Sequence, residues 1–193
     1  MTTKPRLTSN HFIYYQMDEH LRKLTKVYSK MLPLRIDLHY SLDDNKQCNK
    51  TIQQACNDIK ALTTKLFECI EHLVGFVWVM EVSKTDNIHF HTFFFANGQK
   101  IQKYYPIYEK INSLWLEILN KKGYTYDCNK NKKSYKYNAL GILKHNDKDA
   151  LKRVSYVLSY MAKDEQKEGI EDKYKYGLSK VPKPSGRGRP RKN

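Results

Sequence analysis

Two histidines one residue apart, His89 and His91, lie in the apolar run IHFHTFFF at 88–95. On a β-strand successive side chains alternate between faces, so both imidazoles point the same way, together with Phe93 and Phe95. Two imidazoles about 7 Å apart along a strand suit a borderline divalent ion. The alternative is a pair of buried histidines with satisfied hydrogen bonds. Burying them in an apolar sheet without compensation is costly, which favours the metal site.

A harder ion such as magnesium or manganese also takes oxygen ligands, and Glu81 is the nearest carboxylate. If the hairpin loop is 85–87, with Asn87 in the left-handed conformation, Glu81 lies opposite His91 on the same face. A loop with an even number of residues would turn Glu81 to the other face. We therefore predict an odd loop and a metal cluster of Glu81, His89 and His91.

A second group of reactive side chains, Tyr156, Tyr160 and Lys163, follows about 65 residues later. Their spacing places them on one face of a helix. A phenol attacks phosphorus only with help, which a metal that polarises the phosphate supplies. Lys163 could stabilise the tyrosinate or the phosphate charge. The alternative is that both tyrosines are core aromatics and that Lys163 is solvated.

The overall charge points to a polyanionic partner. The 193 residues, enough for one domain, carry a formal charge of +15. Nucleic acid is the preferred partner, since neutralising phosphates releases counterions. An acidic membrane surface is the rival, but we find no amphipathic segment with a dense basic face, and the longest apolar run, 73–80, is too short to cross a bilayer. We expect no membrane partner.

The cysteines and the N-terminus predict a cytoplasmic protein. The polar start has no apolar stretch behind it, so we expect no signal peptide. The cysteines form no CxxC pair and no zinc-ribbon spacing, which fits a reducing compartment. They are Cys48, Cys56, Cys69 and Cys128.

Apolar periodicity predicts the elements that hold these residues. Helices are expected over 10–31 (ended by Pro33), 52–70, 104–121 (stopped by Gly123) and about 148–166 (capped by Asn146 or Asp147). A half-buried strand is expected over 34–40, a further strand over 137–143 and a loop over 129–138. The run 74–81 and the histidine strand have no polar face, so they are central strands covered by helices.

The C-terminal segment is strongly basic, with eight basic and no acidic residues from Lys173 onward. We expect 182–193 to be disordered in isolation. Its Arg-Gly-Arg-Pro run resembles an AT-hook, whose arginines enter a narrow minor groove. The alternative is a solvated tail that adds only non-specific affinity. The candidate DNA-binding residues are Lys183, Arg187, Arg189 and Arg191.

Taken together, these motifs resemble the HUH endonucleases, in which a histidine-hydrophobic-histidine strand binds a metal and a helix presents one or two tyrosines. The subgroup that they resemble is the inovirus-type replication proteins, the YagK/YfjJ C-terminal domain group. The matching residues are Tyr156, Ser159, Tyr160, Ala162 and Lys163, the segment Gly177-Leu-Ser-Lys180 and the strand Arg35-Ile-Asp-Leu38. The resemblance covers roughly 33–180, between an N-terminal helical segment (1–32) and the basic tail (181–193).

The resemblance implies an α+β fold, with a central antiparallel sheet flanked by helices. It implies magnesium- or manganese-dependent nicking of single-stranded DNA, presented in a hairpin or otherwise, at a rolling-circle origin of a phage or plasmid. Tyr160 would form the first 5′-phosphotyrosine and Tyr156 the second. Because the chain has no GxxxxGK[ST] loop, unwinding would come from a host helicase. Two alternatives stay open: a catalytically silent DNA-binding regulator, and a transposase or relaxase with the same chemistry.

Overall fold

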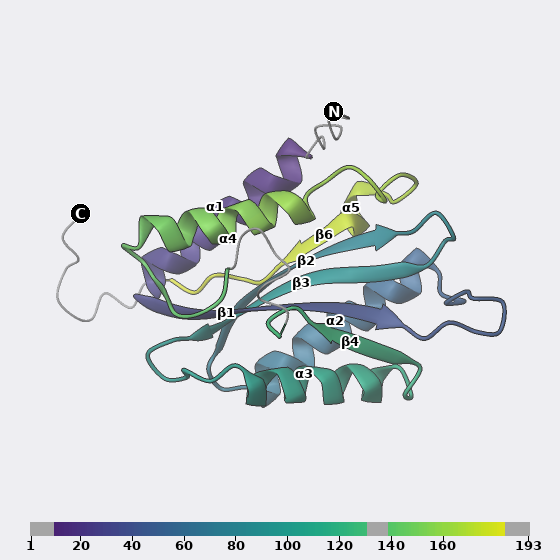
Figure 1. Ribbon diagram of the computed structural model, residues 1–193, viewed down its shortest axis with the longest axis horizontal. Helices are drawn as coiled ribbons and strands as arrows, with labels where there is room; N and C mark the ends of the chain where they lie inside the picture. The colour runs from purple at the N-terminus through teal and green to yellow at the C-terminus, as the bar shows by residue number, and fades with distance from the viewer. Residues whose placement is uncertain (1–9, 131–138, 184–193) are drawn as a thin grey trace.

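A six-stranded antiparallel sheet separates two helical layers in the computed structural model, which describes residues 10–130 and 139–183 (Figure 1). The strand order is β4-β1-β3-β2-β6, and β5 pairs with the start of β1. The strands are β1 (Lys30–Tyr40), β2 (Leu73–Val82), β3 (Ile88–Asn97), β4 (Gly123–Asp127), β5 (Leu143–Lys144) and β6 (Tyr176–Leu178). The predicted α+β architecture is confirmed.

The helices lie on opposite faces of this sheet (Figure 1). One layer contains α2 (Ile52–Cys69) and α3 (Tyr105–Ile118), and the other contains α1 (His11–Val27) and α4 (Lys148–Met161). A short helix, α5 (Asp172–Lys175), leads into β6. Helices α1 and α4 pack against each other and against the sheet, and the Asn10 N–H donates to the Ala162 carbonyl at 2.6 Å. The N-terminal helix therefore shares a core with the tyrosine helix.

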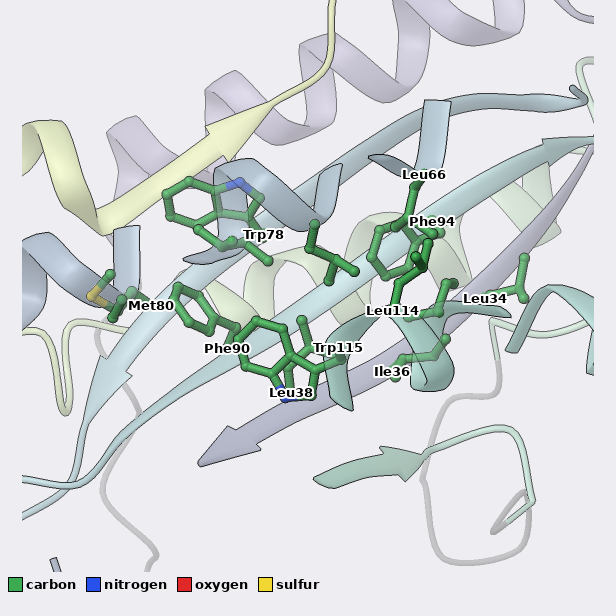
Figure 2. Packing of buried hydrophobic residues seen from close by; sticks show 14 of the residues in the cluster. Leu34, Ile36, Leu38, Leu66, Trp78, Met80, Phe90, Phe94, Leu114 and Trp115 are labelled. Carbon is green, nitrogen blue, oxygen red and sulfur yellow. The ribbon is translucent and has the colours of Figure 1, made fainter. Parts of the chain in front are cut away.

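The layer of α2 and α3 covers a largely apolar sheet face (Figure 2). Phe90 and Phe94 of β3 project into it, and the Trp115 ring packs edge-on against Phe90. The buried Trp115 indole donates its N–H to the His39 carbonyl at 3.0 Å, which ties α3 to β1. This packing supports the sheet from behind, while the other face carries polar side chains beside a second apolar cluster under α1 and α4.

The expected end of the first helix was wrong. Helix α1 ends at Val27, and Pro33 lies inside β1, opposite Phe95 of β3. The Arg35 N–H points away from β3, toward Asn129. Since backbone nitrogens two residues apart on a strand point to the same side, the ring nitrogen of Pro33 also points away from β3. At that position neither β4 nor β5 pairs with β1, so the missing N–H costs no ladder bond. Strand β1 is also buried on both faces rather than half-buried.

The ends of two later helices also differ from expectation. Helix α3 stops at Ile118 rather than just before Gly123, and Asn120 and Lys121 after it take the left-handed conformation. Gly123 instead begins β4, where a Cβ would lie 2.8 Å from the His39 carbonyl oxygen. Helix α4 has the predicted N-cap, Asp147, but ends at Met161 rather than 166.

Of the strand expected over 137–143, Leu143 lies in β5, Ala139 to Ile142 are not strand, and 137–138 lie outside the described residues. The described part of the loop expected over 129–138 has no helix or strand. No helix in the described part of the chain is long and apolar enough to cross a bilayer.

Candidate metal centre and tyrosine helix

The hairpin of β2 and β3 brings Glu81 to the same face as His89 and His91. The loop runs over 83–87, five residues rather than three, so it is odd as predicted. The register is shifted by two residues, and Glu81 lies opposite His89 instead of His91. The left-handed residue is Asp86, with φ 56°, rather than the expected Asn87.

Hydrogen bonds explain this longer loop. The Ser83 N–H donates to the Asn87 carbonyl, and the Ser83 hydroxyl accepts from the Asn87 N–H at 3.1 Å. The Asn87 side chain accepts from the Cys48 N–H at 3.0 Å, which fastens the loop to the segment before α2. The loop residues thus bond to each other across the turn and to the segment before α2, and the last residue pair of the two strands is Val82 with Ile88.

The three predicted ligands converge on one point. The Glu81 Oε2 atom lies 3.1 Å from His91 Nε2 and 3.3 Å from His89 Nε2, and one ligand atom from each side chain falls within 4.8 Å of the others. Neighbouring ligands bound at about 2.0–2.2 Å to one ion are themselves roughly 3.0–3.5 Å apart. The two nitrogens and one carboxylate oxygen therefore fit a divalent metal.

Two buried charged side chains hold these ligands in place. Asp37 Oδ1 lies 2.9 Å from His91 Nδ1, on the side of the ring away from Glu81. The Lys167 Nζ atom donates to Glu81 Oε1 at 2.8 Å, so the other carboxylate oxygen faces the histidines. Carboxylates behind a metal-binding histidine fix its orientation and its tautomer. Asp37 and Lys167 thus preorganise the candidate site.

The same contacts set the protonation of the site. Burial opposes a charge on His91, but Asp37 and Glu81 outweigh it and raise the pKa of His91 to about 9. Burial would raise the pKa of Glu81, yet the hydrogen bonds with the two histidines and the nearby Lys167 hold it well below its usual range. Burial lowers the pKa of Lys167, although Glu81 opposes this shift. Because a metal binds neutral imidazole, loading the site would release a proton from His91.

Tyr160 of α4 lies on the face of the metal cluster. The Arg35 guanidinium carbon is 5.8 Å from the centroid of the Tyr160 ring, and Arg35 Nε is 3.7 Å from Asp37 Oδ1. Asp37 in turn contacts His91. A chain of contacts therefore leads from the ring of Tyr160, 46% of which is exposed, to the predicted metal ligand.

The other residues of the tyrosine motif have different surroundings. Lys163 Nζ lies over the Tyr160 ring, 3.3 Å from its centroid. Tyr156 lines a groove between α1 and α4, together with Arg22, Lys148 and Lys152. The two tyrosines are similarly exposed, but Arg35, the link to the metal cluster, lies beside Tyr160. Neither ring is a core aromatic.

Of the candidate DNA-binding residues, Lys183 is exposed at the end of the described chain. Arg187, Arg189 and Arg191, and with them the AT-hook-like run and most of the segment expected to be disordered, lie outside the described residues.

Sequence reasoning missed four residues around the candidate site. Arg35, Asp37 and His39 alternate with apolar residues along β1, and this alternation marks a polar face that was not followed up. Asp37 and Arg35 were noted within a matching strand, without a role in the site. Lys167 gives no signal in the sequence, since its position depends on the backbone turn after α4 that places the Gln166 carbonyl against the Val82 N–H.

Comparison with known proteins gives one family. The family model of the YagK/YfjJ C-terminal domain matches residues 4–179, which includes α1 and every described strand and helix. Searches of curated proteins and of solved structures returned no match.

Proposed function

The chain belongs to the YagK/YfjJ C-terminal domain family, and we propose that it is an HUH-type endonuclease that nicks single-stranded DNA and remains joined to it through Tyr160. The cut would start rolling-circle replication, with the strand opened by a host helicase. The chain of contacts from the Tyr160 ring through Arg35 and Asp37 to His91 carries the proposal. The charge of +15 supports a nucleic-acid substrate.

In the proposed reaction the Tyr160 oxygen attacks the phosphorus of one phosphodiester. The bond between phosphorus and the 3′ oxygen breaks, the phenol proton goes to solvent, and the 3′ oxygen takes up a proton to become a free hydroxyl. A divalent ion at Glu81, His89 and His91 would polarise the phosphate and stabilise its added charge. The product is a 5′-phosphotyrosine, and the 3′-hydroxyl can prime synthesis.

The residues around Tyr160 would support this step electrostatically. Arg35 is held between Asp37 and the Tyr160 ring, a position from which a guanidinium can contact a phosphate oxygen. The Lys163 cation lies over the Tyr160 ring, where it would offset negative charge that develops on the reacting groups. Tyr156, on the same helix, would accept the strand in the later transfer that ends a round of replication.

Matched tyrosine variants test the proposal. Purified protein is incubated with a single-stranded origin oligonucleotide and manganese, and covalent adducts are detected by gel shift and mapped by mass spectrometry. We expect an adduct on Tyr160 that is lost in EDTA and in Tyr160→Phe. Tyr156→Phe, the control on the same helix, should retain this first adduct.

Tight binding without any adduct in the wild type would contradict the proposal and favour a silent DNA-binding regulator. Preferred cutting of transposon ends or transfer origins would keep the chemistry but replace the replication role by that of a transposase or relaxase.

A further inference from the structure

A row of side chains crosses four strands on the face that carries the metal cluster. Tyr124 of β4 lies opposite His39 of β1, His39 lies opposite His89 of β3, and His89 lies opposite Glu81 of β2. Directly opposite residues in antiparallel strands point to the same side of the sheet. The row therefore begins at the candidate metal ligands and ends at β4, the last strand of the sheet on that side.

The rings of this row are stacked. The His39 and His89 rings are 5.4 Å apart at their centroids, and the His39 and Tyr124 rings are 4.7 Å apart, each pair with an interplanar angle of 7°. The result is a continuous stack of rings that leads out from a candidate metal ligand.

The outer end of the stack is open to solvent. Tyr124 is 52% exposed, although His39 stacks on one face of its ring. Exposed Lys121 and Lys122 immediately precede β4. Two strand spacings, roughly 10 Å, separate Tyr124 from His89. An aromatic face beside cationic side chains is the arrangement that binds bases of single strands, because every base presents a flat π-face.

We propose that Tyr124, backed by His39, is a stacking platform for one unpaired nucleobase of the DNA strand whose phosphate is held at the metal cluster. This inference rests on the proposed function for the identity of the strand and adds a contact that positions it. Stacking tolerates any base, so the platform would contribute affinity and placement rather than sequence choice. It would also favour single-stranded over duplex DNA, whose bases are already stacked on each other.

The experiment uses the full chain in EDTA, so that no cutting occurs. Single-stranded oligonucleotides carry 2-aminopurine at one scanned position, since the fluorescence of this base falls when it stacks on a ring. We expect quenching with the wild type and with Tyr124→Trp, and its loss with Tyr124→Ala. The affinity of Tyr124→Ala should fall by about fivefold to a hundredfold, the range measured for loss of one stacked base.

Phe67→Ala is the matched control, because Phe67 is a similarly exposed aromatic (41%) on α2, in the opposite layer. It should retain both quenching and affinity. Circular dichroism and thermal unfolding check that each variant is folded, and Tyr124→Trp retains a ring if Tyr124→Ala does not fold.

Unchanged quenching and affinity in folded Tyr124→Ala would overturn the platform, and so would equal quenching by duplex DNA. The outcome is separable from that of the proposed function. Adduct formation on Tyr160 without an effect of Tyr124 rejects the platform alone, whereas Tyr124-dependent quenching without any adduct supports the platform and rejects the endonuclease.

Discussion

On β1, Ile36 and Leu38 point into the layer of α2 and α3, whereas Asp37 and His39 between them point to the other side. Strand β3 repeats this division, with Phe90 on the apolar side and the two histidines opposite. One set of strands thus supplies both a hydrophobic core and a titratable face. The apolar face gains most of its stability from burial, while the charged face buries groups that cost free energy unless they are paired.

The comparison between the two faces explains how the side chains of the candidate site can be positioned accurately. Rings and carboxylates on neighbouring strands are fixed by the sheet ladder, and the packing of Trp115 and Phe90 behind them keeps that ladder from moving. Side chains on rigid elements hold reactive groups more accurately than loops do. The apolar face can therefore be regarded as the support of the titratable one.

The largest expected effect is a difference in stability between substitutions at two neighbouring residues of β3, Phe90 and His89. Phe90→Ala should lower the free energy of unfolding by about 3–5 kcal/mol, because it removes a wholly buried ring. His89→Ala should cost far less stability but should remove a metal ligand. Urea unfolding and manganese titration of both variants measure the two effects. Equal losses of stability would show that the two faces are not used differently.

A buried histidine on the titratable side of the sheet should make the stability of the protein depend on pH. His20 of α1 is buried and contacts the Ser179 hydroxyl at 3.1 Å. Burial, assisted by Lys23, lowers the pKa of His20 to about 4 from its ordinary 6.5. The folded protein favours the neutral form of His20. The contribution of His20 to the free energy of unfolding is therefore fully present above pH 6.5, and the free energy of unfolding falls by about 3 kcal/mol as the pH drops to 4.

The control for this pH dependence is His20→Gln, which can keep a hydrogen bond to Ser179 but does not titrate. Urea unfolding between pH 7 and 4 should show a shallower loss of stability in this variant than in the wild type. The same slope in both proteins would mean that His20 does not titrate as inferred.

The smallest effect concerns the support of the metal ligands. Asp37→Asn keeps the shape of the side chain but removes the charge that lies against His91 Nδ1. We expect manganese affinity to fall by about tenfold to a hundredfold, as for other residues that orient a metal-binding histidine. Calorimetric titration gives the affinity directly. An unchanged affinity would show that the strand backbone alone orients His91.

Much of this arrangement could be predicted from the sequence, because strand alternation fixes which side chains share a face. The histidine strand and the amphipathic tyrosine helix followed from periodicity, and Glu81 followed from the odd length expected for the hairpin loop. The length of the 83–87 loop did not, since it depends on hydrogen bonds from Ser83 and Asn87 that reach beyond the hairpin. Pro33 was misassigned because the gap between β4 and β5 is a property of the sheet, not of the local sequence.

Lys167 bears on the order in which the protein folds and binds an ion. Its ammonium group and the Arg35 guanidinium lie against the two carboxylates, Glu81 and Asp37, so the pocket is already electrically compensated. A zinc finger, in contrast, stays unfolded until its metal arrives. We expect this chain to fold before it binds an ion, so that the supply of metal would regulate the proposed catalysis without unfolding the protein.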